Sequence, residues 1–142
     1  MKVKLSETTY FNESKKVYKL QVGTFYFFNK FIVGEINEGE NVNWGNCQQI
    51  IKLAIDFYPN EIKVNYISNR INEYSVSPAD WLKFLKNVNR IKNYYIVCSS
   101  KSSFTNLIFE KLFFKKRIYQ TNSLQTAITK CLEQEKNQFT NP

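Results

Sequence analysis

The sequence predicts an α/β fold: a single domain with a mixed, mostly parallel sheet of about four to six strands, an N-terminal antiparallel hairpin and about four helices. Three observations predict it. Two strand-like runs near the N-terminus are separated by only two residues. From residue 43 onward, segments of helical period alternate with short β-branched runs. No repeat, linker or low-complexity segment interrupts the 142 residues, so a single core is expected.

The N-terminal third is expected to form strands. Apolar and polar side chains alternate along 17–22 (VYKLQV), as in a strand with one buried face. The runs 24–28 (TFYFF) and 31–36 (FIVGEI) flank an Asn-Lys pair, which we expect to form the turn of a hairpin. Residues 1–15 are compatible with either a short edge strand or an irregular segment.

The middle of the chain is expected to alternate between helix and strand. The first helix should begin after Asn43, whose side chain is a favourable N-cap, and stop before Pro59. Residues 61–68 (EIKVNYIS) follow as a buried strand. The second helix should open at Ser77 and Pro78, because proline suits the first helical position.

The C-terminal part continues this alternation. Residues 93–98 (NYYIVC) are almost continuously apolar, which is typical of an interior strand of a parallel sheet. We expect the core to cover about residues 16–133, with residues 136–142 frayed. The remaining expected elements are a serine-rich loop at 99–103, a helix over 104–112, a short edge strand at 117–120 and a last helix capped by Ser123.

The composition argues against several classes of function. The net charge of +8 is compatible with nucleic-acid binding, yet the charge is spread along the chain without a groove-reading motif, so nucleic acid is not the expected partner. The chain contains no histidine, which removes His-dependent hydrolases and His-containing zinc sites. The three cysteines, Cys47, Cys98 and Cys131, lie far apart and are expected to be reduced. No apolar run is long enough for a membrane span, and the first residues lack the apolar centre of a secretory signal, so a cytoplasmic protein is expected.

No catalytic set, cofactor site or metal site is expected. The four glycines are isolated and form no phosphate-binding loop. Glu35, Glu38 and Glu40 have a spacing that a hard cation accepts, but calcium loops need more ligands in a fixed order, which favours a solvated connection. The basic residues between 111 and 117 are explained by the preference of a helix end for positive charge.

The loop after the 61–68 strand carries the candidate partner-binding residues, Asn69, Arg70, Asn72 and Tyr74. Ligands and partners of parallel sheets meet the loops beyond the carboxyl ends of the strands. Asparagine and arginine side chains also brace turns internally. Two roles therefore stay open: holding the loop together, or, for Arg70, binding an anionic group of a ligand or partner.

Two serines end this loop. Ser77 has a structural explanation, because with Asp80 it forms a capping box around Pro78. Ser75 has no such explanation and is the candidate phospho-acceptor, since a phosphate one turn before a helix would be stabilised by the helix dipole. An unmodified turn serine is the alternative.

Several segments are distinctive in combination: VGEI at 33–36, YISNRIN at 66–72, YSV at 74–76 with Pro78, YIV at 95–97 and EKLFF at 110–114. With these segments the chain resembles the STAS-like, SpoIIAA-like proteins, in a small variant found in bacteria. The resemblance implies a non-catalytic module that binds a regulatory protein partner, with a serine after the 61–68 strand phosphorylated by an antagonist kinase. Ser75 is the nearest match by position, although Tyr74 precedes it where the family has aspartate, and the usual following glycine is absent.

The expected function is thus a non-catalytic, regulatory protein-binding module of STAS-like type, with control by serine phosphorylation as an option. The alternative is a carrier of a small apolar molecule or lipid, and nucleic-acid binding is a weaker alternative. The carrier would line its pocket with the aromatic residues Phe27, Phe28, Phe31, Phe113 and Phe114.

Overall fold

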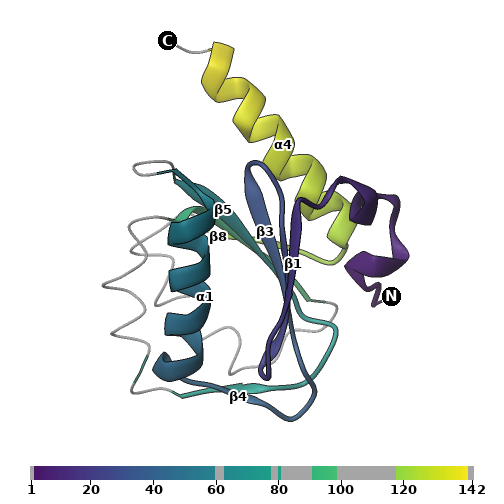
Figure 1. Ribbon diagram of the computed structural model, residues 1–142. Coiled ribbons are helices and arrows are strands. Elements are labelled where there is room, and N and C mark those ends of the chain that lie inside the picture. Colours follow the sequence, from purple (N-terminus) through teal and green to yellow (C-terminus); the bar gives the residue numbers. More distant parts are fainter. Residues whose placement is uncertain (1, 60–62, 78–79, 81–90, 99–117, 141–142) are drawn as a thin grey trace.

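A computed structural model describes residues 2–59, 63–77, 80, 91–98 and 118–140, and all structural statements refer to them (Figure 1). A mixed six-stranded sheet runs through the molecule in the order β1-β2-β3-β5-β7-β8. The first two pairings are antiparallel and the remaining three are parallel, which confirms the predicted α/β class and the N-terminal hairpin. The strands are β1 (Lys16–Lys19), β2 (Gly23–Phe27), β3 (Phe31–Ile36), β5 (Val64–Asn69), β7 (Ile91–Val97) and β8 (Ile118–Thr121).

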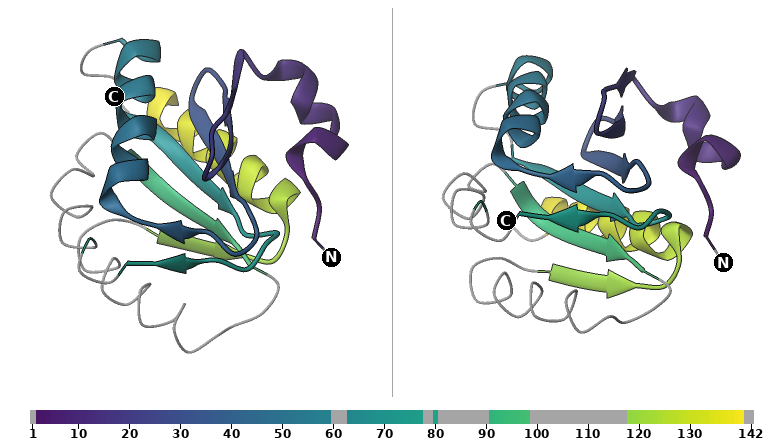
Figure 2. Two further views of the ribbon diagram at one scale, coloured as in Figure 1. Left: turned by 60° about the horizontal axis from the view of Figure 1, so that its bottom comes forward. Right: turned by 90° about the horizontal axis from the view of Figure 1, so that it is seen from below.

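Two helices cover opposite faces of this sheet, α1 (Trp44–Phe57) on one face and α4 (Leu124–Thr140) on the other (Figures 1 and 2). Because side chains alternate along a strand, each strand contributes to two cores. On β3, Phe31 and Val33 lie in the core beneath α4, whereas Ile32 and Ile36 lie in the core beneath α1. The helices expected near 77–88 and 104–112 fall mostly outside the described residues.

The limits of α1 follow from its sequence as predicted. The Asn43 side chain accepts a hydrogen bond from the backbone N–H of Asn46 (3.0 Å), and the Asn46 side chain accepts one from the N–H of Asn43 (2.8 Å). This reciprocal pair satisfies two donors at the start of the helix. At the other end, the Tyr58 hydroxyl donates to the Phe28 carbonyl (2.6 Å), so the end of α1 is tied to the hairpin turn.

The N-terminal segment, which precedes the expected core of about residues 16–133, contributes Leu5 to the core beneath α4. Two short 3₁₀ helices, η1 (Leu5–Glu7) and η2 (Thr9–Glu13), lie on the α4 side of the sheet (Figures 1 and 2). Leu5 is fully buried there among side chains of β2, β3 and α4. The burial of one large apolar side chain holds a segment that has no strand or helix periodicity of its own.

The last helix is longer than expected. The predicted cap at Ser123 is present, since its hydroxyl accepts from the N–H of Thr126 (3.2 Å). The helix α4 continues to Thr140, into the segment 136–142 that was expected to fray. Two contacts hold the helix to the sheet just beyond residue 133: Gln134 accepts a hydrogen bond from Tyr95, and Glu135 accepts one from Asn65.

A second, two-stranded parallel sheet lies beside the main one and was not predicted. It pairs β4 (Asn41–Val42) with β6 (Ser75–Val76). Strands of two residues carry no readable alternation, which is why the sequence pattern did not indicate them. This small sheet connects the end of the hairpin to the loop that follows β5.

Glycine at position 34 is required by the close approach of two strands. A Cβ built on Gly34 would lie 2.0 Å from the Tyr66 hydroxyl oxygen and 3.1 Å from Cδ1 of Phe25. Both neighbours come from strands that flank β3, so neither side chain moves without disturbing the sheet.

We therefore expect Gly34→Ala to lower the free energy of unfolding by about 1 to 3 kcal/mol, as overpacking of a core does. Urea denaturation of the two proteins measures the difference. The matched control is Gly45→Ala, where the new Cβ meets the Asn43 side-chain oxygen at 3.2 Å in an exposed first helical turn. Equal stability of the two variants would contradict the steric explanation.

Candidate functional site

The candidate site lies at the carboxyl ends of β3, β5 and β7, where the partner loop (residues 69–77) leaves the sheet. The backbone N–H of Arg70 donates to the Val97 carbonyl (3.0 Å), so the loop starts firmly attached to β7. At its other end the N–H of Ser75 donates to the Glu40 carbonyl (3.0 Å). The loop is thus fixed at both ends.

Arg70 and Tyr74 form a stacked pair within this loop. The guanidinium carbon lies 4.5 Å from the centroid of the Tyr74 ring, and both side chains are half-buried. A guanidinium stacked on an aromatic face keeps its N–H groups in the plane, pointing away from the ring. Among the described residues, none forms a hydrogen bond or ion pair with the Arg70 guanidinium. Its donors therefore stay open for an acceptor.

The two asparagines of the predicted set brace the loop. The Asn69 amide donates to the Val3 carbonyl (2.9 Å) and to Glu35 Oε2 (2.8 Å), and the side chain is almost completely buried. The Asn72 amide donates to the Ile36 carbonyl (2.9 Å). Of the predicted partner-binding residues, Asn69 and Asn72 thus hold the loop, whereas the Arg70 guanidinium stacks on the Tyr74 ring and forms no hydrogen bond or ion pair among the described residues.

Ser75 lies in β6 and its side chain is exposed. Its hydroxyl donates to Asn41 Oδ1 (2.8 Å), and the amide of Asn41 donates to the Ser77 hydroxyl (2.7 Å). A single side chain of β4 therefore bonds both serines.

The expected capping box of Ser77 and Asp80 was wrong, because their backbone N–H groups bond elsewhere. The N–H of Ser77 donates to the Val42 carbonyl (2.9 Å), and the N–H of Asp80 donates to the Ser77 carbonyl (3.1 Å) rather than to the Ser77 hydroxyl. The Asp80 carboxylate accepts from the N–H of Trp44 (2.8 Å) and so carries negative charge to the N-terminus of α1, where the helix dipole favours it.

A cluster of hydroxyl groups beside Arg70 was missed by the sequence analysis. Tyr66 and Tyr94 lie opposite one another on β5 and β7 with ring centroids 5.3 Å apart. The Ser68 and Tyr74 hydroxyl oxygens are 3.4 Å apart. Burial raises the pKa values of the Tyr66 and Tyr94 hydroxyls well above the usual value for tyrosine. We name Tyr66, Ser68, Arg70, Tyr74 and Tyr94 the tyrosine cluster.

One signal could have indicated this cluster. Gly34 interrupts an otherwise bulky apolar strand, and a glycine inside a strand marks a close approach of another group. The approaching group is the Tyr66 hydroxyl, yet the separation of 32 positions in sequence means that a local pattern cannot identify this partner.

Glu35 forms a buried junction on the opposite face of the same sheet edge. Its Oε2 accepts from the backbone N–H of Leu5 (2.7 Å) and from the Asn69 amide (2.8 Å), and the side chain is only 6% exposed. Burial raises the pKa of this carboxyl above its usual value, while the bonds from Leu5 and Asn69 and the charge of Lys4 act in the other direction, and Glu7 adds to the increase.

The acidic residues near Glu35 do not converge on a cation. Glu38 accepts a hydrogen bond from the backbone N–H of Glu73 (2.7 Å) on the partner loop, whereas Glu35 is directed into the α4 side of the sheet. Over the described ranges, no group of three or more acidic or cysteine side chains is arranged to hold a metal ion. None of the three cysteines forms a disulfide, and burial raises the pKa of the Cys47 thiol to about 12.

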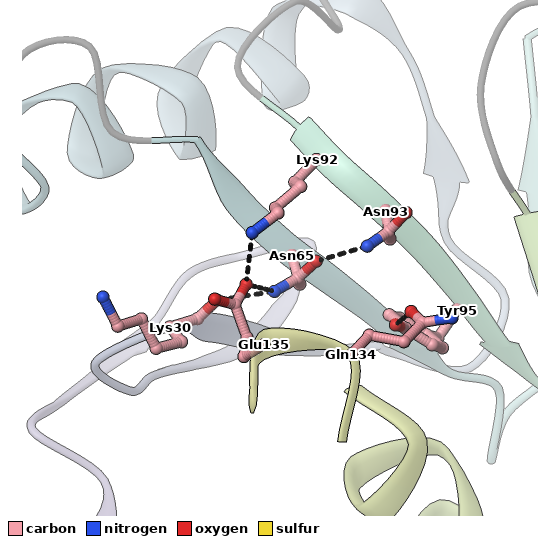
Figure 3. A network of polar contacts seen from close by, with 7 residues as sticks. All are labelled: Lys30, Asn65, Lys92, Asn93, Tyr95, Gln134 and Glu135. Atoms are coloured by element: carbon pink, nitrogen blue, oxygen red, sulfur yellow. Dashed lines mark hydrogen bonds and ion pairs between the residues drawn. The ribbon is translucent and has the colours of Figure 1, made fainter. Parts of the chain in front are cut away.

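A second polar network lies at the amino ends of β5 and β7 (Figure 3). Glu135 of α4 accepts from the amide of Asn65 (2.7 Å) and forms an ion pair with Lys92 (3.0 Å). Asn65 also bonds the Lys30 carbonyl (3.1 Å) and the amide of Asn93 (3.2 Å). All of these groups are bonded to one another, so the network holds α4 on the sheet and leaves no open donor like that of Arg70.

The aromatic residues proposed to line a carrier pocket lie in the two cores. Phe28 and Phe31 stack with centroids 4.4 Å apart beneath α4, and Phe27 contacts Phe57 and Tyr58 beneath α1. The remaining two, at positions 113 and 114, fall outside the described residues.

Within the described part of the chain, no helix has the length and apolar character that a membrane span requires.

Comparison of the chain with protein-family models, curated proteins and solved structures finds no match.

The raised pKa of Glu35 predicts how the free energy of unfolding depends on pH. Because its pKa is raised in the folded state, the folded protein keeps a proton that the unfolded chain loses as pH rises above about 4.5. The free energy of unfolding of the wild type should therefore fall, relative to that of Glu35→Gln, as pH rises through the window above 4.5. Urea denaturation at several pH values measures this difference.

The control for loss of a carboxylate is Glu13→Gln, at an exposed position of η2. It should show the pH dependence of the wild type. A stability difference between wild type and Glu35→Gln that stays constant across pH would contradict the assignment.

Proposed function

We propose that this chain is a non-catalytic, regulatory module of STAS-like type that binds a protein partner in the cytoplasm through its partner loop (69–77). The observation that carries the proposal is the stacked pair of Arg70 and Tyr74. It presents an arginine with open donors at the carboxyl edge of a parallel sheet, the usual place for ligands and partners of such sheets. Arginine and tyrosine are also the residue types that contribute most to protein interfaces.

The rigidity of the loop supports a role in binding. Asn69 and Asn72 bond it to β3 and to the N-terminal segment, and Glu38 bonds the backbone of Glu73. A surface that is ordered before it meets a partner loses less conformational entropy on binding. The two roles left open by the sequence are then divided between residues: the asparagines hold the loop and Arg70 contacts the partner.

Ser75 is the proposed point of control. Its hydroxyl is exposed and donates to Asn41 across the small sheet. A phosphate in its place would remove this donor and add about two negative charges beside the partner loop. Both changes alter the surface that a partner meets, without disturbing either core.

A non-catalytic role is supported by the composition. The chain has no histidine, and within the described ranges no three or more acidic or cysteine side chains gather in one place. The open cation of the site is an arginine, which holds charge but does not exchange protons near neutral pH.

The proposal is tested by crosslinking and affinity capture with the wild type, Arg70→Ala and Ser75→Asp. Loss of the guanidinium should weaken partner binding by about ten- to a hundredfold, as expected for a charge-assisted contact at an interface. Ser75→Asp should change the captured partner in amount or identity, because it adds charge at the proposed point of control.

The matched control is Lys130→Ala. Its ammonium lies 4.5 Å from the Tyr119 ring centroid on the α4 side, so this variant also removes one cation stacked on a tyrosine. It should capture the same partner as the wild type. Identical capture by Arg70→Ala, Ser75→Asp and wild type would refute the proposal.

A further inference from the structure

The tyrosine cluster differs from the other polar groups of the core because one of its hydroxyls is left without a partner. Within the described residues, the Tyr66 hydroxyl forms no hydrogen bond, although it lies directly over the backbone of Gly34. The Tyr66 side chain packs against the core beneath α1 and is only partly buried. Because a phenol hydroxyl at the edge of a core normally finds an acceptor or donor, this group can complete its hydrogen bonding with a bound molecule.

The neighbouring groups show what kind of molecule would complete it. The cluster offers hydroxyls from Tyr66, Ser68 and Tyr74, all of which can donate, and the donors of the Arg70 guanidinium. Arg70 is close enough to lower the pKa of Tyr94, which places its positive charge beside the hydroxyls as well as over the Tyr74 ring. Several donors with one positive charge match an oxyanion.

The charge of the cluster selects between oxyanions. Among the described residues, Arg70 is the one cation of the cluster, and no described carboxylate lies in it. A single guanidinium balances the single charge of a carboxylate, and the planar fork of its donors matches the two carboxylate oxygens. A phosphate would bring nearly two charges into a partly buried site with one countercharge.

We propose that the tyrosine cluster is a binding site for a carboxylate group, held by the Arg70 guanidinium and by the hydroxyls of Tyr66, Ser68 and Tyr74. The inference deepens the proposed function and rests on it: the group that a partner presents to Arg70 is a carboxylate. It also admits a free small carboxylate as occupant, because the chemistry of recognition is the same.

Nuclear magnetic resonance titration with sodium acetate tests the site directly, with sodium chloride and inorganic phosphate at matched ionic strength as references. The Arg70 Nε–H signal is assigned by its absence in Arg70→Lys, since the chain has only two further arginines, Arg90 and Arg117. Acetate should shift this signal with saturation, and phosphate should bind more weakly. A short glutamate peptide should shift the same signal if the carboxylate comes from a protein.

Two variants separate a binding role from a structural one. Arg70→Ala should weaken acetate binding by about tenfold or more, and Lys130→Ala should leave it unchanged. Tyr66→Phe removes a hydroxyl that has no described partner, so thermal stability should stay the same or rise while acetate binding weakens severalfold. A purely structural tyrosine would show no change in binding.

The inference is overturned if acetate produces no saturable shift, if phosphate binds more tightly than acetate, or if Tyr66→Phe and Arg70→Ala bind acetate like the wild type. These results are distinguishable from failure of the proposed function. Partner capture that depends on Arg70 without acetate binding would retain the partner surface and remove the carboxylate site. Conversely, if acetate binds but Arg70→Ala leaves partner capture unchanged, the carboxylate site is retained and the proposed partner surface is removed.

Discussion

The arrangement of the carboxyl edge of the sheet depends on one buried carboxylate, that of Glu35. Its Oε2 joins three segments: β3 from which it projects, the N-terminal segment through Leu5, and the end of β5 through Asn69. A carboxylate in this position is costly to bury, and the cost is offset only while both donors stay in place. The positions of the N-terminal segment and of the partner loop are therefore coupled, because both depend on hydrogen bonds to the same carboxylate oxygen.

Polar side chains are hydrogen-bonded differently at the two ends of the sheet. At the amino ends of β5 and β7, Glu135 of α4 closes a network in which Asn65, Asn93 and Lys92 bond to one another (Figure 3). At the carboxyl ends, the tyrosine cluster holds the Tyr66 hydroxyl and the Arg70 guanidinium, which have no hydrogen-bond partner among the described residues. A closed polar network fixes how elements pack. The site proposed for recognition therefore lies at the end of the sheet opposite the network that holds α4.

Much of the fold could be predicted because its determinants are local. Turn length sets the hairpin, Asn43 caps the helix that follows it, and alternation of helix and strand sets the parallel order. What could not be predicted depends on groups distant in sequence. The burial of Leu5 against β3 and the pairing of β4 with β6 leave no periodic mark, so they emerge only from three-dimensional packing.

The same distinction holds within the candidate site. Arg70 and Ser75 could be singled out because they lie in a loop, where a charged or polar side chain lacks a routine role. Tyr66 and Tyr94 lie in strands, where aromatic residues are enriched and a role in core packing is the ordinary interpretation. Only the strand register, which sets Tyr66 opposite Tyr94 and Gly34 opposite Ser68, brings their hydroxyls to one place.

The small sheet of β4 and β6 has a consequence for motion. It consists of two residue pairs, and the bond from the Asn72 amide to the Ile36 carbonyl links its loop to the main sheet. Such a unit opens at a lower free energy than the six-stranded sheet, so its amide hydrogens exchange with solvent by local opening rather than by global unfolding. Amide exchange at Ser75 and Ser77 then reports the local stability of the loop, while exchange in β3 and β5 reports the stability of the whole fold.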